Sequence, residues 1–169
     1  MKTFSEFMLE CSQLDESSLS RIKSKTDKGG VAILSGSRGD KSSKENKARA
    51  KQLDRDIKGK GLPGATKVTG RWTENPGTKD EKKVKERSHV VTSGKMGKRK
   101  FKKTVKALGK KYDQDAVIIQ NKPKGSATVS ATRKGGLGKS KNVKLGKFKP
   151  QGKNPEGQSQ IKGKTFTYG

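Results

Sequence analysis

The sequence predicts an α+β fold of the ferredoxin-like, split-βαβ type, with an antiparallel sheet, a short N-terminal helix and a basic, poorly structured C-terminal tail. Two segments have apolar residues at helical spacing, and four short segments are apolar throughout or alternate in polarity. Their order along the chain is β-α-β-β-α-β, and right-handed crossovers would place both helices on one face of the sheet. Only 26% of the residues are hydrophobic, so much of the chain is expected to lie outside a packed core.

The first half of the predicted domain contains two strands and a helix. A short apolar run at 31–34 follows two glycines and is typical of a buried strand. Ser42 and Glu45 have the spacing of a capping box, and apolar residues follow at helical spacing, namely Ala50, Leu53 and Ile57. Residues 66–73 then alternate in polarity, which predicts a half-exposed strand.

The second half repeats this pattern after a charged hairpin loop at 78–87. A strand is expected at 88–92, a helix after Gly97 and an apolar strand at 116–119. A fifth strand is possible at 128–131, and residues 164–168 alternate as an edge strand would. The expected core consists of Ile33, Leu53, Ile57, Val68, Val91, Phe101, Val105, Leu108, Val117 and Ile119.

Composition divides the chain into three regions. Residues 1–27 carry four basic and five acidic side chains and are expected to form a leader helix and a linker. Residues 28–121 are expected to form the small α+β domain. Residues 122–169 carry twelve basic side chains and one acidic side chain, which predicts a Gly- and Lys-rich tail that is mostly extended.

The net charge of +26 indicates a polyanionic partner, and nucleic acid is the first choice. An anionic membrane surface is a weaker choice, because no long basic amphipathic helix is present. The outer face of the second helix has no acidic residue to offset its lysines, so phosphate contacts would relieve their repulsion. The predicted nucleic-acid contacts are Lys98, Arg99, Lys100, Lys102, Lys103, Lys106, Lys110, Lys111, Arg133, Lys134, Lys139 and Lys141.

Several other kinds of site are disfavoured. A single cysteine, Cys11, and a single histidine, His89, exclude an internal disulfide and a Cys- or His-based metal site. The run at 136–140 resembles the end of a phosphate-binding loop, but Arg133 stands where that motif needs glycine. The two central strands carry no aromatic residue on which an RNA base could stack.

The remaining polar residues suggest two further hypotheses, an anion pocket and a small enzyme. Arg38, Asn46, Arg87 and Gln114 stand at strand ends or helix starts, where they could line an anion pocket, although surface solvation explains them equally well. The candidates for acid–base chemistry are His89, Glu74, Glu86 and Asp115. A small enzyme acting on a nucleotide or nucleic acid, with Arg38, Glu45, Glu74 and His89 as its pocket, is a third hypothesis.

Two resemblances add to these expectations. The start Met1-Lys2-Thr3-Phe4, with Phe7 and a Met8-Leu9-Glu10 end, resembles the capsid-targeting leader of internal head proteins in T4-like tailed phages. That resemblance implies cleavage between Glu10 and Cys11. The body, from Ser42 to the Thr-Phe-Thr-Tyr end, resembles small phage proteins of unknown function.

Together these observations predict a non-enzymatic internal head protein of a phage that binds packaged DNA without sequence specificity through phosphate contacts. Its expected partners are nucleic acid, most simply duplex DNA, and phage head proteins during assembly, with no membrane and no cofactor. Its expected location is the virion interior and then the host cytoplasm. The alternative is an early host-takeover protein that binds RNA, the ribosome or a host enzyme.

Overall fold

A computed structural model describes residues 19–74, 78–135, 137, 139–150, 157–161 and 164–168. A helix at 19–28 is followed by ten further elements. They are β1 (Val31–Leu34), α2 (Ser43–Gly59), β2 (Thr66–Glu74), β3 (Lys82–Thr92), α3 (Lys98–Lys111), β4 (Ala116–Gln120), β5 (Ser126–Ala131), β6 (Asn142–Pro150), β7 (Gly157–Ile161) and β8 (Lys164–Tyr168). The predicted leader and the Glu10–Cys11 processing site lie outside the described residues.

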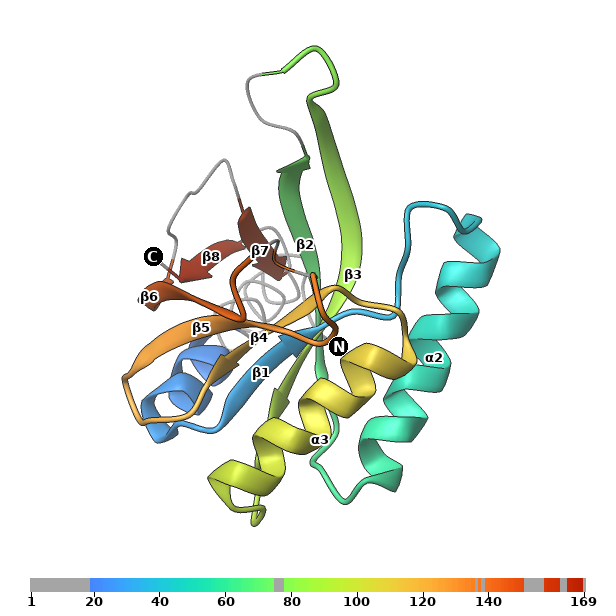
Figure 1. The fold of residues 1–169 in the computed structure, drawn as a ribbon. Helices are drawn as coiled ribbons and strands as arrows, with labels where there is room; N and C mark the ends of the chain where they lie inside the picture. The colour runs from blue at the N-terminus through green and yellow to red at the C-terminus, as the bar shows by residue number, and fades with distance from the viewer. Residues whose placement is uncertain are drawn as a thin grey trace, which may run out of the picture.

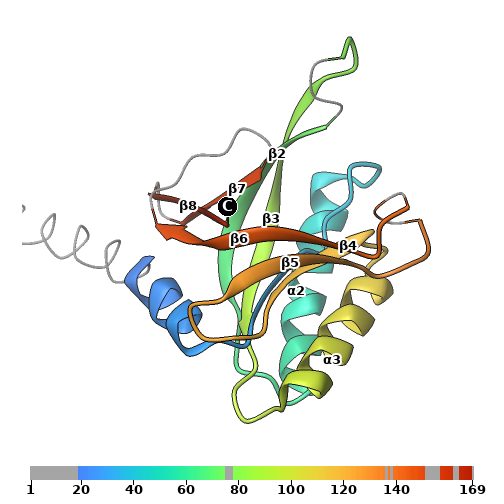
Figure 2. The same cartoon turned by 60° about the vertical axis from the view of Figure 1, so that its left-hand side comes forward.

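All eight strands of the described chain belong to one antiparallel sheet that closes on itself. The order around the barrel is β1-β3-β2-β7-β8-β6-β5-β4, and β1 pairs with β4 to complete the ring. The hairpin of β2 and β3 extends well beyond the body of the barrel (Figures 1 and 2). Helices α2 and α3 lie side by side against the part of the sheet that contains β1, β3 and β4 (Figure 1).

The predicted fold class is therefore wrong, although the first six predicted elements are present in the predicted order. A ferredoxin-like sheet has two free edges, whereas here β5 to β8 continue the sheet until it meets β2. The tail expected to be poorly structured supplies these four strands. Residues 82–87, expected in a hairpin loop, form the start of β3 instead.

The tail was misjudged because its strands combine a few buried aromatic residues with many lysines and other polar residues. Phe166 and Tyr168 alternate with Thr167 along β8, and the rings of both aromatic residues contact Phe148 of β6. The three lysines of β6 are exposed, and so is Val143. A strand that alternates in this way contributes to a core while keeping the low hydrophobicity of a solvated segment.

Two hydrophobic clusters stabilise the fold. The first lies between the sheet and helices α2 and α3, and it is built from residues such as Leu53, Phe101 and Val105. The second fills the barrel, where Leu19 and Ile22 of the helix at 19–28 pack with Val90 and Phe166. All ten residues of the expected core are buried, but Ile33 and Val68 belong to the barrel cluster rather than to the helix-covered one.

A buried amide joins three distant segments inside the barrel. Gln120 of β4 donates hydrogen bonds to the carbonyl oxygens of Thr26 and Lys122, at 2.6 and 2.9 Å. The hydroxyl of Tyr168 donates to the side-chain oxygen of Gln120 at 2.7 Å. Burial raises the pKa of Tyr168, so the phenol remains a donor. Within the described residues, none of the helices is long and apolar enough to cross a membrane.

Candidate functional site

A large open cleft lies between the start of α2, the middle of the β2–β3 hairpin and the loop that joins α3 to β4. Its volume is about 1440 Å³. The lining includes residues from the loop after β1, from α2, from β3 and from the start of β4. Each of the two α–β halves of the predicted domain contributes one wall of the cleft. The cleft therefore brings together residues that are far apart in the sequence.

The loop after β1 is shaped by side chains that hydrogen bond to its backbone. Ser35 accepts a hydrogen bond from the Ser37 backbone N–H at 3.1 Å and donates one to the carbonyl oxygen of Arg87 at 2.6 Å. Asn46, from the first turn of α2, accepts from the Arg38 backbone N–H and donates to the Arg38 carbonyl oxygen, both at 3.0 Å. This two-way contact requires an amide, because a carboxylate has no hydrogen to donate.

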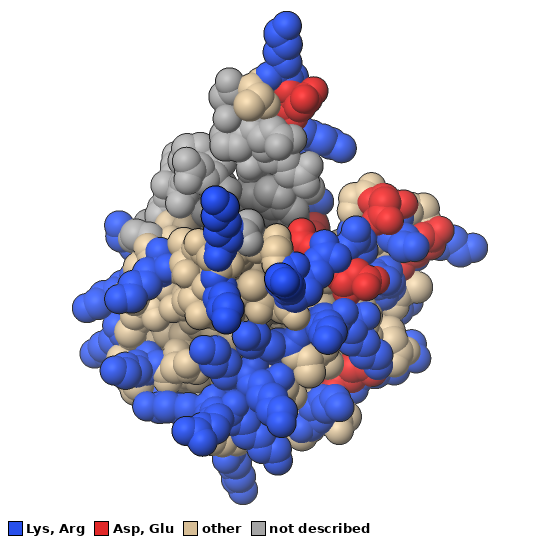
Figure 3. Space-filling view, viewed as in Figure 1, with Lys and Arg blue, Asp and Glu red and all other residues tan. Residues whose placement is uncertain are grey.

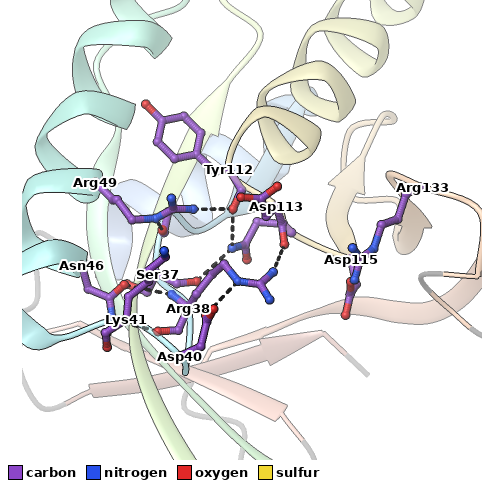
Figure 4. Close-up of polar contacts among 12 residues, drawn as sticks. Ser37, Arg38, Asp40, Lys41, Asn46, Arg49, Tyr112, Asp113, Asp115 and Arg133 are labelled. Carbon is purple, nitrogen blue, oxygen red and sulfur yellow. Dashed lines mark hydrogen bonds and ion pairs between the residues drawn. The ribbon is translucent and has the colours of Figure 1, made fainter.

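Three long side chains then join this loop to the loop between α3 and β4 (Figure 4). Arg49 donates to the carbonyl oxygens of Gly36 and Tyr112, both at 2.6 Å. Gln114 donates to the carbonyl oxygen of Ser37 at 2.9 Å, and Arg38 donates to that of Asp113 at 2.5 Å. We call these three residues the loop clip.

Gly36 lies where α2 and the end of α3 approach it closely. A Cβ atom there would lie 3.2 Å from the carbonyl oxygen of Arg49 and 3.4 Å from the Tyr112 ring. Arg49 also lies over that ring, with its guanidinium carbon 5.5 Å from the ring centre. These contacts hold α2 against the end of α3, next to the cleft.

The two arginines of the loop clip already have partners for their charged groups. Arg38 donates to Asp40 at 3.0 Å, and this hydrogen bond lowers the pKa of the Asp40 carboxyl. Arg49 is occupied by two carbonyl oxygens. Both therefore support the loops beside the cleft rather than act as free cations, and of the two Arg38 is part of the cleft lining.

The cleft also has three carboxylates among its lining residues, Glu86, Asp113 and Asp115. Asp113 has a positive φ of 57° because it directly follows the C-cap of α3, where the backbone hydrogen bonds form a Schellman motif. Asp115 forms an ion pair with Arg133. These carboxylates provide the negative groups that a cationic ligand would contact.

The structure brings some of the predicted site residues together and separates others. Arg38, Asn46 and Arg87 line this one cleft, as do Glu86 and Asp115. Glu45 donates its backbone N–H to the hydroxyl of Ser42, the N-cap of α2, and is exposed outside the cleft lining. The side chain of Glu74 is outside those described. That the three polar residues bind an anion stays a prediction.

His89 is fully buried beneath α2 and cannot touch a ligand in the cleft. Its Nε2 lies 3.2 Å from a carboxylate oxygen of Asp54, but neither ring nitrogen has a partner with hydrogen-bond geometry. Burial, the largest effect, lowers the pKa of His89, so the ring is neutral at neutral pH. His89 is therefore a structural residue of the interface between β3 and α2.

The residues predicted to contact nucleic acid are spread over the surface rather than gathered in the cleft. Most of those on α3 are exposed, and Figure 3 shows the excess of Lys and Arg over Asp and Glu on the visible face. Lys111 forms an ion pair with Asp56, and Arg133 pairs with Asp115. Nucleic-acid binding by these residues stays a prediction. Among the described residues, no group of His, Cys, Asp and Glu could hold a metal ion.

A family model described as the S-adenosylmethionine lyase family matches residues 32–169. The chain belongs to this family. The match covers most of the chain and includes every segment that lines the cleft. No curated protein matches the chain.

This membership overturns the functional predictions made from composition. The family is named for an enzyme, so the expected non-enzymatic, DNA-binding internal head protein is wrong. The error arose because charge reports on the surface of a protein, whereas a small-molecule site depends on a few residues brought together by the fold. Asp113 was missed as a cleft residue for this reason, and Arg49 and Tyr112 were missed as residues that support the loops beside the cleft.

Proposed function

We propose that this protein cleaves S-adenosylmethionine and that the cleft between α2, β3 and β4 is its active site. The observation that carries the proposal is the match to the S-adenosylmethionine lyase family over residues 32–169. The cleft supports it, because a volume of about 1440 Å³ is ample for a ligand of that size.

The chemistry of the substrate allows cleavage without water. S-adenosylmethionine has a sulfonium centre, and its own carboxylate can attack the carbon Cγ that is attached to sulfur. A bond forms from the carboxylate oxygen to Cγ while the bond from Cγ to sulfur breaks, and the electron pair stays on sulfur. The products are homoserine lactone and 5′-methylthioadenosine, so no proton, oxidant or added group is needed.

Such a reaction sets particular demands on a site. The positive sulfonium and the negative carboxylate neutralise each other as the bond forms, so an arginine that paired tightly with the carboxylate would stabilise the ground state more than the transition state. Arg38 and Arg49 already donate to backbone carbonyls and, in the case of Arg38, to Asp40. In this proposal they hold the cleft wall, and Asp113 holds the cationic end of the substrate.

The direct test is to incubate the purified protein with S-adenosylmethionine and to identify the products by mass spectrometry. We expect 5′-methylthioadenosine and homoserine lactone. In water enriched in ¹⁸O, homoserine formed by later opening of the lactone should carry the label in its carboxyl group. A label in the hydroxyl group would show direct hydrolysis and would contradict a lyase, as would a complete absence of cleavage by folded protein.

The role of the carboxylate is tested with Asp113→Asn. Removing the negative charge should raise KM about fivefold to tenfold, which corresponds to roughly 1 kcal/mol for one partly exposed charge contact. Asp27→Asn is the matched control, because Asp27 pairs with Lys23 outside the cleft. Equal KM values for the two variants would remove Asp113 from the proposed site.

A further inference from the structure

The cleft has more positive charge than a site for a cationic substrate requires. Its cationic lining consists of Arg38, Lys41, Lys44, Lys47, Lys82, Lys83, Lys85 and Arg87, against Glu86, Asp113 and Asp115. S-adenosylmethionine itself has a net charge of +1 at neutral pH, from its ammonium, sulfonium and carboxylate groups. A cleft lined mainly by one sign of charge concentrates the field, so these lysines repel the proposed substrate.

The excess charge is arranged on two facing walls. On β3, Lys83, Lys85 and Arg87 alternate along one face of the strand, opposite residues 73, 71 and 69 of β2. On the other wall, Lys44 and Lys47 are one helical turn apart at the start of α2, and Lys41 precedes them. The lysines therefore converge on the cleft from two separate elements.

Neighbouring carboxylates do not neutralise these lysines. Asp40 pairs with Arg38, and Asp115 pairs with Arg133. Among the residues that the structure describes, no ion pair joins Lys41, Lys44, Lys47, Lys83 or Lys85 to a carboxylate. Like charges that line one cleft repel one another, and a bound anion would reduce that repulsion.

We propose that this cleft binds a small multivalent anion carrying phosphate groups, held between the lysines at the start of α2 and those of β3. Phosphate oxygens accept charge-assisted hydrogen bonds from several lysines at once. The cleft has room for such an anion beside the substrate, because its volume exceeds the 300–1,000 Å³ that is usual for one small ligand. The anion site does not depend on the proposed lyase activity. Where both hold, the anion lowers KM because it neutralises the field that repels the substrate.

The test measures binding of inorganic tripolyphosphate by titration calorimetry, with sodium chloride at equal ionic strength as the reference. The cleft variant combines Lys83→Ala with Lys85→Ala. The control variant combines Lys98→Ala with Lys100→Ala, which removes the same charge from α3, outside the cleft. Circular dichroism confirms that each variant is folded before binding is measured.

We expect tripolyphosphate to bind the parent protein and the control variant with similar affinity. The cleft variant should bind roughly fivefold to tenfold more weakly, since two exposed charge contacts are lost. Equal weakening in both variants would show general charge attraction and would overturn the proposal, as would no binding beyond that of chloride. A short duplex oligonucleotide that displaces tripolyphosphate, and that itself depends on Lys83 and Lys85, would overturn the assignment to a small anion.

The calorimetric result is independent of turnover, so failure of the anion site and failure of the proposed activity are distinguishable. If the protein cleaves S-adenosylmethionine, KM should fall when tripolyphosphate is added to the parent protein and should not fall in the cleft variant. A rise of KM with tripolyphosphate would show competition for one site and would contradict simultaneous binding.

Discussion

Asn46 shows how a single amide can shape a loop from the helix that follows it. Its oxygen and nitrogen bond to the backbone N–H and carbonyl of Arg38, and the nitrogen also lies 3.4 Å from the Lys41 carbonyl oxygen. The loop after β1 is thereby held in one conformation at the mouth of the cleft. Any chemistry in the cleft depends on that conformation, although Asn46 need not touch the substrate.

Asn46→Asp should therefore impair activity, although the two side chains are nearly the same size. The carboxylate keeps the acceptor but loses the donor, and it places a negative charge beside two carbonyl oxygens, which should cost about 1–3 kcal/mol. We expect kcat/KM for S-adenosylmethionine to fall at least about tenfold. Lys51→Ala, at an exposed position of α2, is the control and should leave kcat/KM unchanged. Equal rates would show that the loop does not need this contact.

Tyr112 and Asp56 form a second polar link, between α3 and α2. Asp56 accepts hydrogen bonds from Lys111 at 2.8 Å and from the Tyr112 hydroxyl at 2.5 Å, and these bonds lower the pKa of Asp56 to about 2. A carboxyl whose pKa is lower in the folded than in the unfolded protein stabilises the fold above its unfolded pKa of 3.8. That stabilisation is lost as the pH falls from about 4 to about 2.

Tyr112→Phe should raise the pKa of Asp56 and reduce the free energy of unfolding at neutral pH by about 1 kcal/mol, because one hydrogen bond is lost. The loss of stability between pH 4 and pH 2 should become smaller in this variant. Urea unfolding at a series of pH values measures both effects. A pH dependence identical to that of the parent protein would show that Tyr112 does not influence Asp56.

These residues also show which parts of the site the sequence could predict. Arg38, Asn46 and Arg87 stand out because they are polar residues next to strand ends, and the structure does place them in one cleft. Arg49 has the sequence context of any charged residue on a helix surface. Its partners are backbone carbonyl oxygens in two separate loops, and nothing in the local sequence reports such contacts.

Among the elements, helix α3 was the most readily predicted from sequence, because its apolar stripe and lysine-rich face define a buried and an exposed side. Gly109 lies on its buried side, near the C-terminal end. A Cβ atom at this position would lie 2.7 Å from Val117 and 2.8 Å from Thr132. The glycine therefore allows α3 to approach β4 and the end of β5 closely.

Gly109→Ala should destabilise the protein by about 1–3 kcal/mol, because overpacking outweighs the better helix propensity of alanine. Gly59→Ala, at the end of α2, is the matched control, since nothing lies within 4 Å of its added Cβ. We expect the control to be neutral or slightly stabilising. Urea unfolding of both variants tests this, and similar stabilities would show that α3 shifts to accommodate the methyl group.

The strands of the C-terminal third were the elements that the amino-acid composition failed to predict. Helix α3 places its apolar residues on one continuous stripe, whereas the few apolar residues of β6 and β8 are separated by lysines and other polar residues. Residues 128–131 and 164–168 still showed strand character in the sequence. Whether such strands close a barrel depends on pairings between distant segments, such as β2 with β7, which no local pattern specifies.

At the scale of the whole molecule, closure of the barrel depends on β7 and β8. β7 pairs with β2, β8 pairs with β6, and the two strands pair with each other. Phe166 is 1% exposed and packs in the barrel with Phe148. Without these strands, both β2 and β6 would present unpaired edges.

A chain that ends at residue 150 should therefore fail to form a stable monomer. We expect it to aggregate or to lose cooperative unfolding, whereas Phe166→Ala should remain folded but lose about 3–5 kcal/mol of stability. Light scattering and thermal unfolding measure these outcomes. A truncated chain that stays monomeric and unfolds cooperatively would show that the remaining strands form a fold of their own.

The net charge of +26 also acts on the proposed reaction as a whole. Because the substrate is a cation, the KM for S-adenosylmethionine should fall as sodium chloride rises from about 0.01 M to about 0.15 M, where screening acts over a shorter distance. This trend is opposite to that of an enzyme whose charge attracts its substrate. Steady-state kinetics over this range tests it, and a KM that rises with salt would show that the local carboxylates dominate.

The closed ring of strands also sets conditions on how the chain folds. Val31 of β1 pairs with Thr92 and with Gln120. The carbonyl oxygen of Thr26 accepts hydrogen bonds from the Gln120 side chain and from the Lys124 backbone N–H. The N-terminal segments therefore pair with residues that come much later in the chain. Chains dominated by such distant pairings fold slowly and spend longer with strand edges uncovered. The strong positive charge keeps unfolded copies apart during that interval, so the charge that opposes compaction also protects the chain from aggregation while it folds.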